Sequence, residues 1–225
     1  MDLTASYDLA FPVEARSRYE FLEVRNAAAV IGATDGQSLQ EIIGVLVQFE
    51  LLRSDLVAAG GNESKLANRL NHAFRDLGWR EARVDTRVTL ELRKMPYAPA
   101  GETSATVVPT EVLNHGYKVD NVIRRVALDV EWNAKDGNLD RDIGAYRALY
   151  DAGLIDAAVM VTRTTKDLQR LGFHWRTDAG RKDTKALGTA TTTNFSKLQP
   201  RMTRGDSGGC PLLAVGICVR TWAGD

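Results

Sequence analysis

Hydrophobic residues in the first third of the chain follow helical spacing. Residues 36–58, GQSLQEIIGVLVQFELLRSDLVA, repeat apolar positions with a period near 3.6, and the pair Gly60 and Gly61 then ends the predicted helix. Asn62 is a suitable N-cap for a second helix that ends near Gly78. The pattern therefore predicts two successive amphipathic helices before the middle of the chain.

The middle of the chain changes to strand-like alternation. Residues 84–92, VDTRVTLEL, alternate polar and apolar side chains, as a half-buried strand does. Residues 94–110 contain three prolines and are predicted as a loop. Residues 117–133, YKVDNVIRRVALDVEWN, contain two strand-like runs, with a turn predicted around 120–125.

The last third continues with alternating helices and strands. Asp140 and Asp142 are predicted to open a helix that ends at Gly153, because acidic residues favour a first helical turn. The apolar run at 154–163 follows as a buried strand. A polar, basic loop is predicted at 174–190, and after it come a short helix in TTTNFSKLQPRM and a final strand in PLLAVGICV. This order indicates an α/β domain with a mixed sheet.

Length and composition are those of one globular domain. The chain has 225 residues, of which 44% are hydrophobic and 26% charged. No apolar run is long enough to span a membrane, and the N-terminus lacks the basic start and apolar run of a signal peptide. We therefore expect a cytoplasmic protein with no membrane partner.

The charge is balanced overall but unevenly distributed. Residues 1–159 carry 18 Lys/Arg and 24 Asp/Glu, whereas residues 160–204 carry ten Lys/Arg and three Asp/Glu. The basic stretch is either a phosphate-binding face or a solvated surface loop, and charge alone does not separate the two.

The two cysteines do not indicate a metal or disulfide framework. Cys210 and Cys218 both lie in an apolar C-terminal stretch, which favours buried free thiols in a reducing cell. A zinc site would need more ligands nearby, and His72, His115 and His174 stand in unrelated contexts.

A pair of carboxylates on one predicted strand is the main chemical signal. In Asp129-Val130-Glu131-Trp132-Asn133, alternation puts Asp129, Glu131 and Asn133 on one face and gives Val130 and Trp132 to the core. Two acids on one face of an apolar strand repel each other unless a cation lies between them. Hard oxygen ligands favour Mg²⁺ as that cation.

A third acid completes the pattern if the two strand runs form a hairpin. Asp120 lies nine positions before Asp129 and would come beside it. Metal-dependent phosphodiester hydrolases of the PD-(D/E)XK type use a first acid, a second acid and a polar residue two positions after the second. In these enzymes the metal polarises the phosphate and lowers the pKa of a bound water. The competing interpretation is an ordinary surface strand with alternating acids.

Longer stretches of the chain resemble a known family. VALDVEWNAKDGNLDRDIGAYRALYDAGLIDAAVMVTR and TTTNFSKLQPRMTRGDSGGCPLLAVGI are similar to the BglII and BstYI group of restriction endonucleases, and SKLANRLNHAFRDLGWREARV is similar to that group's upstream helix and strand. The resemblance implies a PD-(D/E)XK restriction-endonuclease-like fold, a central mixed β-sheet flanked by helices. It implies one endonuclease domain over residues 1–225, with an N-terminal helical part at 1–61 and a catalytic core at 62–219.

The family's catalytic pattern is an Asp, an acid nine residues on, any residue and then Gln. Carried over by position, Asp120 is the first acid, Asp129 the second, and Glu131 takes the place of Gln; these three are the expected catalytic residues and Mg²⁺ ligands. The chain has Asp129 where the family has Glu, and its acid-x-acid ending resembles BamHI. An alternative register makes Asp120, Glu131 and Asn133 the triad.

The resemblance also implies partners and contacts. We expect a homodimeric type II restriction endonuclease that binds double-stranded DNA and cuts a palindromic, GATC-centred site, with a cognate DNA methyltransferase as its functional companion. The helices at 36–58 and 140–152 are the candidate dimer faces. The alternative for each candidate DNA contact is an ordinary surface residue that does not touch DNA. The candidate DNA contacts are Asn133, Lys135, Asp136, Arg176, Arg181, Lys182, Lys185 and Arg204.

Other interpretations remain beside this one. GDSGG around Ser207 is the string that surrounds the nucleophile of trypsin-like proteases, but His72 lies on a predicted helix and few residues follow Ser207, so a glycine-rich turn is favoured. A non-catalytic DNA-binding module and a nuclease without strict site choice are the further alternatives. Asn71 and Glu63 could approach the metal from the upstream helix, although a solvated helix face is the favoured interpretation for both.

Overall fold

The chain folds into two compact units. The computed structural model describes residues 1–57, 64–178 and 191–224. The core unit comprises Met1–Ala82 and Val119–Asp225, and the ribbon unit comprises Arg83–Lys118. Within the described residues, no helix is long and apolar enough to cross a membrane.

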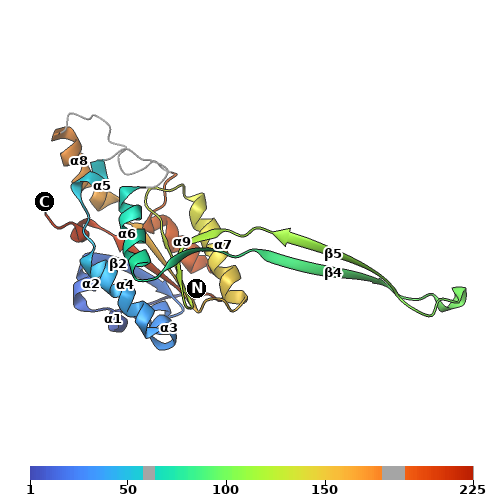
Figure 1. The fold of residues 1–225 in the computed structure, drawn as a ribbon. Coiled ribbons are helices and arrows are strands. Elements are labelled where there is room, and N and C mark those ends of the chain that lie inside the picture. The colour runs from blue at the N-terminus through green and yellow to red at the C-terminus, as the bar shows by residue number, and fades with distance from the viewer. Residues whose placement is uncertain (58–63, 179–190, 225) are drawn as a thin grey trace. The chain divides into compact units, whose positions relative to one another are not determined.

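A mixed seven-stranded sheet forms the centre of the core unit (Figure 1). The three middle strands run parallel, and the neighbouring strand on each side of them pairs antiparallel. This confirms the predicted α/β fold with a mixed sheet. The order across the sheet is β1 (Leu3–Thr4), β2 (Tyr19–Val24), β9 (Leu212–Ile217), β8 (Ala157–Arg163), β7 (Val126–Val130), β6 (Lys118–Ile123) and β3 (Arg80–Arg83).

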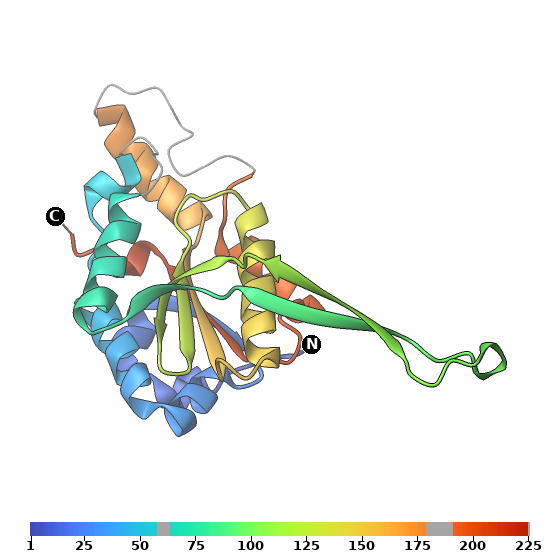
Figure 2. The same cartoon turned by 45° about the vertical axis from the view of Figure 1, so that its right-hand side comes forward.

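Helices cover both faces of the sheet, so the middle strands are buried on both sides (Figures 1 and 2). The first face packs against α2 (Val13–Arg18), α3 (Ala27–Thr34), α4 (Gly36–Gln48), α5 (Arg53–Val57), α6 (Lys65–Asp76) and α8 (Lys166–Asp178). The second face packs against α7 (Gly137–Asp151) and α9 (Phe195–Arg204). A short helix, α1 (Tyr7–Ala10), precedes α2. We call these two apolar layers the first core and the second core.

The N-terminal part, predicted as helical, contains two strands as well as helices. It contributes β1 and β2 to the sheet, and β2 pairs along its whole length with β9. The predicted helix at 36–58 is also divided, because α4 ends at Gln48 and α5 begins at Arg53. Between them Leu51 is extended and fully buried, and its N–H donates to the Thr221 carbonyl at 3.2 Å. Tertiary pairing with the C-terminal segment therefore overrides the helical spacing.

Several helix boundaries also differ from those predicted. Asn62 lies outside the described residues, and α6 is instead capped by Ser64, whose side chain accepts from the Ala67 N–H. Helix α7 begins at Gly137, three residues before the predicted start. Helix α8 extends to Asp178 and so covers the beginning of the segment predicted as a basic loop.

The ribbon unit is a two-stranded antiparallel hairpin. It pairs β4 (Thr86–Lys94) with β5 (Thr106–Asn114), so the loop predicted at 94–110 is wrong for its first residue and its last five. Pro109 fits within β5 because the outer edge of that strand pairs with nothing in this two-stranded sheet. Every residue of both strands is exposed.

One face of the ribbon unit is apolar. Directly opposed residues of an antiparallel pair share a face, and the register places the side chains of Val88, Leu90, Leu92, Val108 and Val112 together. We call this set the apolar ribbon face. A lone two-stranded hairpin is marginally stable in water. All five of these side chains are exposed.

Candidate active site

A tight hairpin sets the acids of the candidate site in register. Strands β6 and β7 pair Ile123 with Val126 and Asn121 with Leu128, which leaves Arg124 and Arg125 as a two-residue turn. One step beyond the paired residues, the Asp120 N–H donates to Asp129 Oδ1 at 2.7 Å, and the Val130 N–H donates to Asp120 Oδ2 at 3.2 Å. The structure therefore places Asp120 beside Asp129, as a hairpin requires.

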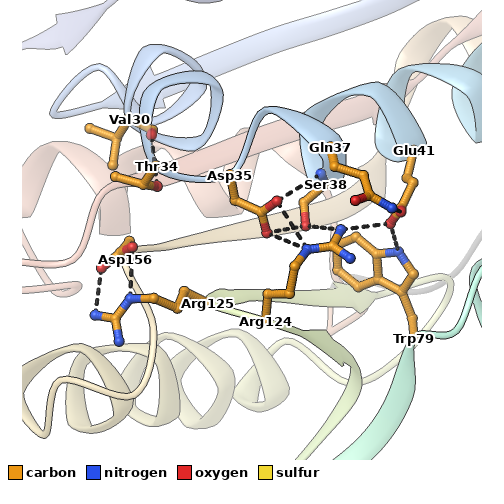
Figure 3. Close-up of polar contacts among 10 residues, drawn as sticks. All are labelled: Val30, Thr34, Asp35, Gln37, Ser38, Glu41, Trp79, Arg124, Arg125 and Asp156. Carbon is orange, nitrogen blue, oxygen red and sulfur yellow. Dashed lines mark hydrogen bonds and ion pairs between the residues drawn. The ribbon is translucent and has the colours of Figure 1, made fainter.

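The turn is anchored by the first of its two arginines (Figure 3). Arg124 adopts a left-handed backbone conformation, with φ of 46°. Its guanidinium donates to both oxygens of Asp35, at 3.0 and 2.9 Å, to Ser38 Oγ at 2.7 Å and to Glu41 Oε2 at 3.1 Å. The indole of Trp79 donates to the same Glu41 oxygen at 2.8 Å. The hairpin end is thus tied to α4.

The second arginine holds the neighbouring loop. Arg125 makes a two-pronged contact with the Asp156 carboxylate, at 2.8 and 2.6 Å (Figure 3). It also donates to the Gly153 carbonyl at 2.9 Å. A one-residue slip of a strand moves each of its side chains to the opposite face. The anchored turn therefore fixes on which face of the sheet Asp120 and Asp129 lie.

We expect Arg124→Ala to destabilise the fold by about 2–3 kcal/mol, because it leaves the nearly buried carboxylates of Asp35 and Glu41 without their cation. Arg125→Ala is the matched control. Its ion pair is more exposed to solvent, and the expected loss of stability is smaller. Urea unfolding of both variants measures the difference, and equal losses would refute the anchoring role of Arg124.

Strand β7 divides its side chains between the two cores. Val126, Leu128 and Val130 pack in the first core, and Trp132 continues that face just beyond the strand. Asp129 and Glu131 alternate with them and so lie toward α7. The alternation ends there, because Asn133 has a left-handed φ of 61°. Asn133 therefore does not continue the acidic face, contrary to the predicted pattern.

Asp129 is almost fully buried and held at both oxygens. Besides the Asp120 N–H at Oδ1, the Tyr146 hydroxyl donates to Oδ2 at 2.6 Å. Burial, followed by the negative charges of Asp120 and Asp142, raises the pKa of Asp129 to about 8. These hydrogen bonds fix the orientation of a carboxylate that lies among other acids.

A fourth acid, Asp142, reaches the cluster from α7. Its side chain is 2% exposed, and Glu131 is 6% exposed. Burial first, and the charge of Asp142 next, raise the pKa of Glu131 to about 9. Glu131 Oε2 and Asp142 Oδ2 are both buried without a hydrogen-bond partner.

Sequence reasoning placed Asp142 in the first turn of its helix and so missed it. Because α7 begins at Gly137, Asp142 lies further along the helix, on the stripe formed by Leu139, Ile143 and Tyr146. The signal that could have found it is a charged residue within an apolar stripe at helical spacing.

The donor set fits a divalent cation. Among the described residues, no group of three or more His, Cys, Asp or Glu side chains is arranged so that it could hold a metal ion by itself. Mg²⁺, however, is commonly held by one or two carboxylates together with phosphate oxygens and waters. The two buried carboxylate oxygens without partners on Glu131 and Asp142 supply hard ligands of this kind.

The predicted DNA-contact residues fall into separate groups. Lys135 is exposed, and its backbone bridges to Thr192, while Asp136 forms an ion pair with Lys197 at 3.2 Å. Arg204 pairs with Asp206 at the far end of α9, about 15 Å along the helix from its start. Arg181, Lys182 and Lys185 lie outside the described residues, as does the side chain of Arg176.

The segment after β7 is tied to the segment before α9. The Thr193 N–H donates to the Ala134 carbonyl at 2.8 Å, and the Asp136 N–H donates to the Thr191 carbonyl at 2.7 Å. Residues distant in sequence therefore come together next to the acids. The structure brings Lys135 and Asp136 to this place but not Arg204.

Asn71 is not on a solvated helix face, so that favoured interpretation is wrong. It is 3% exposed, and Asn121 on β6 donates its side-chain N–H to Asn71 Oδ1 at 2.8 Å. Asn121 is opposite Leu128 and so belongs to the face of the first core, whereas Asp120 and Asp129 lie on the other face. Glu63 lies outside the described residues.

Ser207 is a structural residue of a turn. It is fully buried, and its hydroxyl donates to the Cys210 carbonyl at 3.0 Å, between α9 and β9. A nucleophile must be reached by its substrate, so the protease interpretation is excluded. Cys210 and Cys218 are buried and free, as predicted, and burial raises the pKa of the Cys210 thiol to about 12.

Comparison with known families identifies a match over most of the chain. The model of a family described as restriction endonuclease BglII/BglIII matches residues 19–217. The matched region runs from β2 to the end of β9 and contains all four acids of the cluster. No curated protein matches the chain.

Proposed function

Since the chain belongs to the restriction endonuclease BglII/BglIII family, and is thus a DNA-binding nuclease, we propose that it is a type II enzyme that cuts both strands of a palindromic, GATC-centred DNA site. The observation that carries the catalytic part of the proposal is the juxtaposition of Asp120, Asp129 and Glu131 at the carboxyl end of β7. Ligand sites in α/β sheets commonly lie beyond the carboxyl ends of parallel strands.

The acids have distinct roles in this proposal. Members of the family typically use a divalent metal ion, and we propose Mg²⁺ here, held by Asp120, Asp129 and Glu131. When bound, such an ion polarises the scissile phosphate and makes a water a better nucleophile. The hydrogen bonds from Asp120 N–H and Tyr146 to Asp129 keep its carboxylate oriented, and Glu131 is placed to orient or deprotonate the water.

The register with Asp129 is better supported than the one with Asn133. Asp129 faces Asp120 directly across the hairpin, with hydrogen bonds in both directions between the two segments. Asn133 lies beyond the end of β7 in a left-handed conformation. We therefore assign Asn133 to the DNA-reading segment instead.

We propose two groups of DNA contacts, one with base edges and one with phosphates. Asn133, Lys135 and Asp136 directly follow the acids and suit contacts with base edges, since Asn pairs well with adenine and Lys with guanine in the major groove. Arg204 is proposed as a further base contact. Arg176, Arg181, Lys182 and Lys185 are proposed as phosphate contacts, on the basis of their charge.

Neutralising Lys182 and Lys185 together should weaken binding to every DNA sequence and reduce the salt dependence of the binding constant. For each phosphate that the protein no longer neutralises, the slope of log K against log salt falls in magnitude by about 0.9. Binding titrations of Lys182→Gln/Lys185→Gln at several salt concentrations measure this slope. An unchanged slope would make the segment a solvated loop, and a change confined to one sequence would make it a base reader.

A homodimer is proposed because a palindrome is read by two symmetric copies. The two helical segments predicted as dimer faces direct their large apolar side chains into the cores of their own chain. Exposed apolar residues gather instead in the ribbon unit, which holds 11 of the 19 exposed large hydrophobics among the described residues. Its charge is nearly balanced, with five Lys/Arg and four Asp/Glu, so its apolar face suits a second copy better than DNA.

Digestion of unmethylated phage DNA with Mg²⁺, followed by sequencing of the fragment ends, tests the proposal. We expect identical four-base 5′ overhangs at a GATC-centred palindrome and protection after treatment with the cognate DNA methyltransferase. Heterogeneous ends would favour a nuclease without strict site choice. Binding with no cleavage would favour a non-catalytic DNA-binding module.

A further inference from the structure

We infer that Asp142 and Glu131 together form a divalent-cation site, in which Asp142 is a metal ligand that the family's catalytic pattern does not include. The inference rests on the proposed metal-dependent function and adds to it a ligand from α7. It assigns the cation to the carboxylate at the end of β7 together with the carboxylate on the helix that covers it.

Burial makes this pair unusual. Both carboxyl groups are more than nine-tenths buried, and each has one oxygen, Glu131 Oε2 and Asp142 Oδ2, without a hydrogen-bond partner. A buried carboxylate oxygen without a donor is costly, because it is removed from water and nothing replaces the hydrogen bonds that water would make. A cation that bridges the two oxygens removes both costs at once.

The nearby arginine leaves these two oxygens open. Arg141 Nε donates to Asp142 Oδ1 at 2.8 Å, and its Nη2 lies 4.0 Å from Glu131 Oε1. The guanidinium therefore contacts the other oxygen of each carboxylate. Its side chain is 40% exposed, so it lies at the outer side of the pair and compensates only part of the two negative charges.

Asp129 differs from this pair in its hydrogen bonds. Each of its oxygens already accepts a hydrogen bond, from the Asp120 N–H and from the Tyr146 hydroxyl. Glu131 Oε2 and Asp142 Oδ2, by contrast, accept a hydrogen bond from no N–H group or hydroxyl among the described residues. Two carboxylates with such oxygens, completed by a DNA phosphate and waters, are a common environment for a small divalent cation.

The test is direct Mn²⁺ binding to Asp142→Asn. Mn²⁺ replaces Mg²⁺ at oxygen sites, and the electron paramagnetic resonance signal of free Mn²⁺ reports binding without any cleavage. We expect the dissociation constant for Mn²⁺ to rise at least tenfold in Asp142→Asn. The matched control is Asp151→Asn on the same helix, whose carboxylate is 58% exposed, and it should bind Mn²⁺ like the wild type.

Stability without metal gives a second measurement. Asn keeps the size of the Asp142 side chain, and its amide can donate a hydrogen bond to the Glu131 carboxyl group, so the melting temperature of metal-free Asp142→Asn should stay close to that of the wild type. Asp142→Glu, which keeps a carboxylate, should recover most of the Mn²⁺ affinity. If Asp142→Asn does not fold, Asp142→Ser replaces it, with the same expected outcomes.

The results separate this inference from the proposed function. Wild-type affinity for Mn²⁺ in Asp142→Asn, together with greatly reduced affinity in Glu131→Gln, would overturn the role of Asp142 and keep the metal site. A wild-type protein that binds no Mn²⁺, with or without DNA, would overturn the metal-dependent function itself.

Discussion

Asp129→Asn is expected to lower the rate of DNA cleavage by roughly 10²–10³-fold or more, while DNA binding in Ca²⁺ is retained. Asn keeps the size of the side chain, and its amide oxygen can still accept one of the two hydrogen bonds that Asp129 now accepts. It removes the negative charge from the acid cluster, and that charge is what the proposed metal site requires. Single-turnover cleavage with Mg²⁺ and gel-shift titration with Ca²⁺ measure the two effects.

Asn133→Ala is the companion variant that decides between the two registers. If Asp129 belongs to the triad, Asn133→Ala should retain near-normal cleavage of a bound site and change only affinity or site preference. Near-normal cleavage by Asp129→Asn, together with inactive Asn133→Ala, would make Asp120, Glu131 and Asn133 the triad. The hairpin geometry argues for the first outcome, because Asp120 and Asp129 are hydrogen-bonded neighbours.

The position of the first three acids could be predicted because strand geometry is local. Side chains alternate along any strand, so Asp129 and Glu131 had to share a face, and the first core receives Val130 and Trp132 as expected. A hairpin in which Arg124 and Arg125 form the turn brings Asp120 opposite Asp129 by simple counting. Neither step needs knowledge of the rest of the fold.

Features set by distant contacts could not be predicted in this way. Asp142 belongs to the cluster only because α7 begins at Gly137 and packs on the face that carries Asp129 and Glu131. Leu51 is extended because the C-terminal segment offers its backbone a partner. In both cases the deciding partner lies outside the short window from which local patterns are read.

The ribbon unit is a further part of the fold that local sequence patterns predicted only in part. Three prolines predicted a loop at 94–110, yet Pro109 lies within β5, where the outer strand edge needs no N–H. The alternation at 84–92 correctly indicated a strand, but both faces of that strand are exposed. An alternating pattern therefore predicts the strand but does not predict whether its apolar face is buried.

Leu90→Lys is expected to weaken the homodimer, raising its dissociation constant about 100-fold or more. Leu90 lies on the apolar ribbon face and is 53% exposed in the single chain. If the second copy covers this face, each dimer loses two buried leucines and must bury two charges, and each of these effects costs on the order of 2 kcal/mol. Sedimentation equilibrium measures the constant.

Thr89→Lys is the matched control, because it adds the same charge one residue away on the opposite face. There the new lysine is directly opposite Glu111, which favours the hairpin itself. Thr89→Lys should therefore dimerise like the wild type, and an equal effect of both variants would mean that charge alone weakens association. A wild-type protein that stays monomeric at micromolar concentration would refute the homodimer.

Cleavage of supercoiled plasmid connects this association to function. A monomer with one catalytic site nicks one strand, whereas a symmetric dimer breaks both. At concentrations where Leu90→Lys is monomeric, it should therefore accumulate nicked circles, while Thr89→Lys and the wild type produce linear DNA. Linear product from a monomeric Leu90→Lys would show that double-strand cleavage does not depend on the apolar ribbon face.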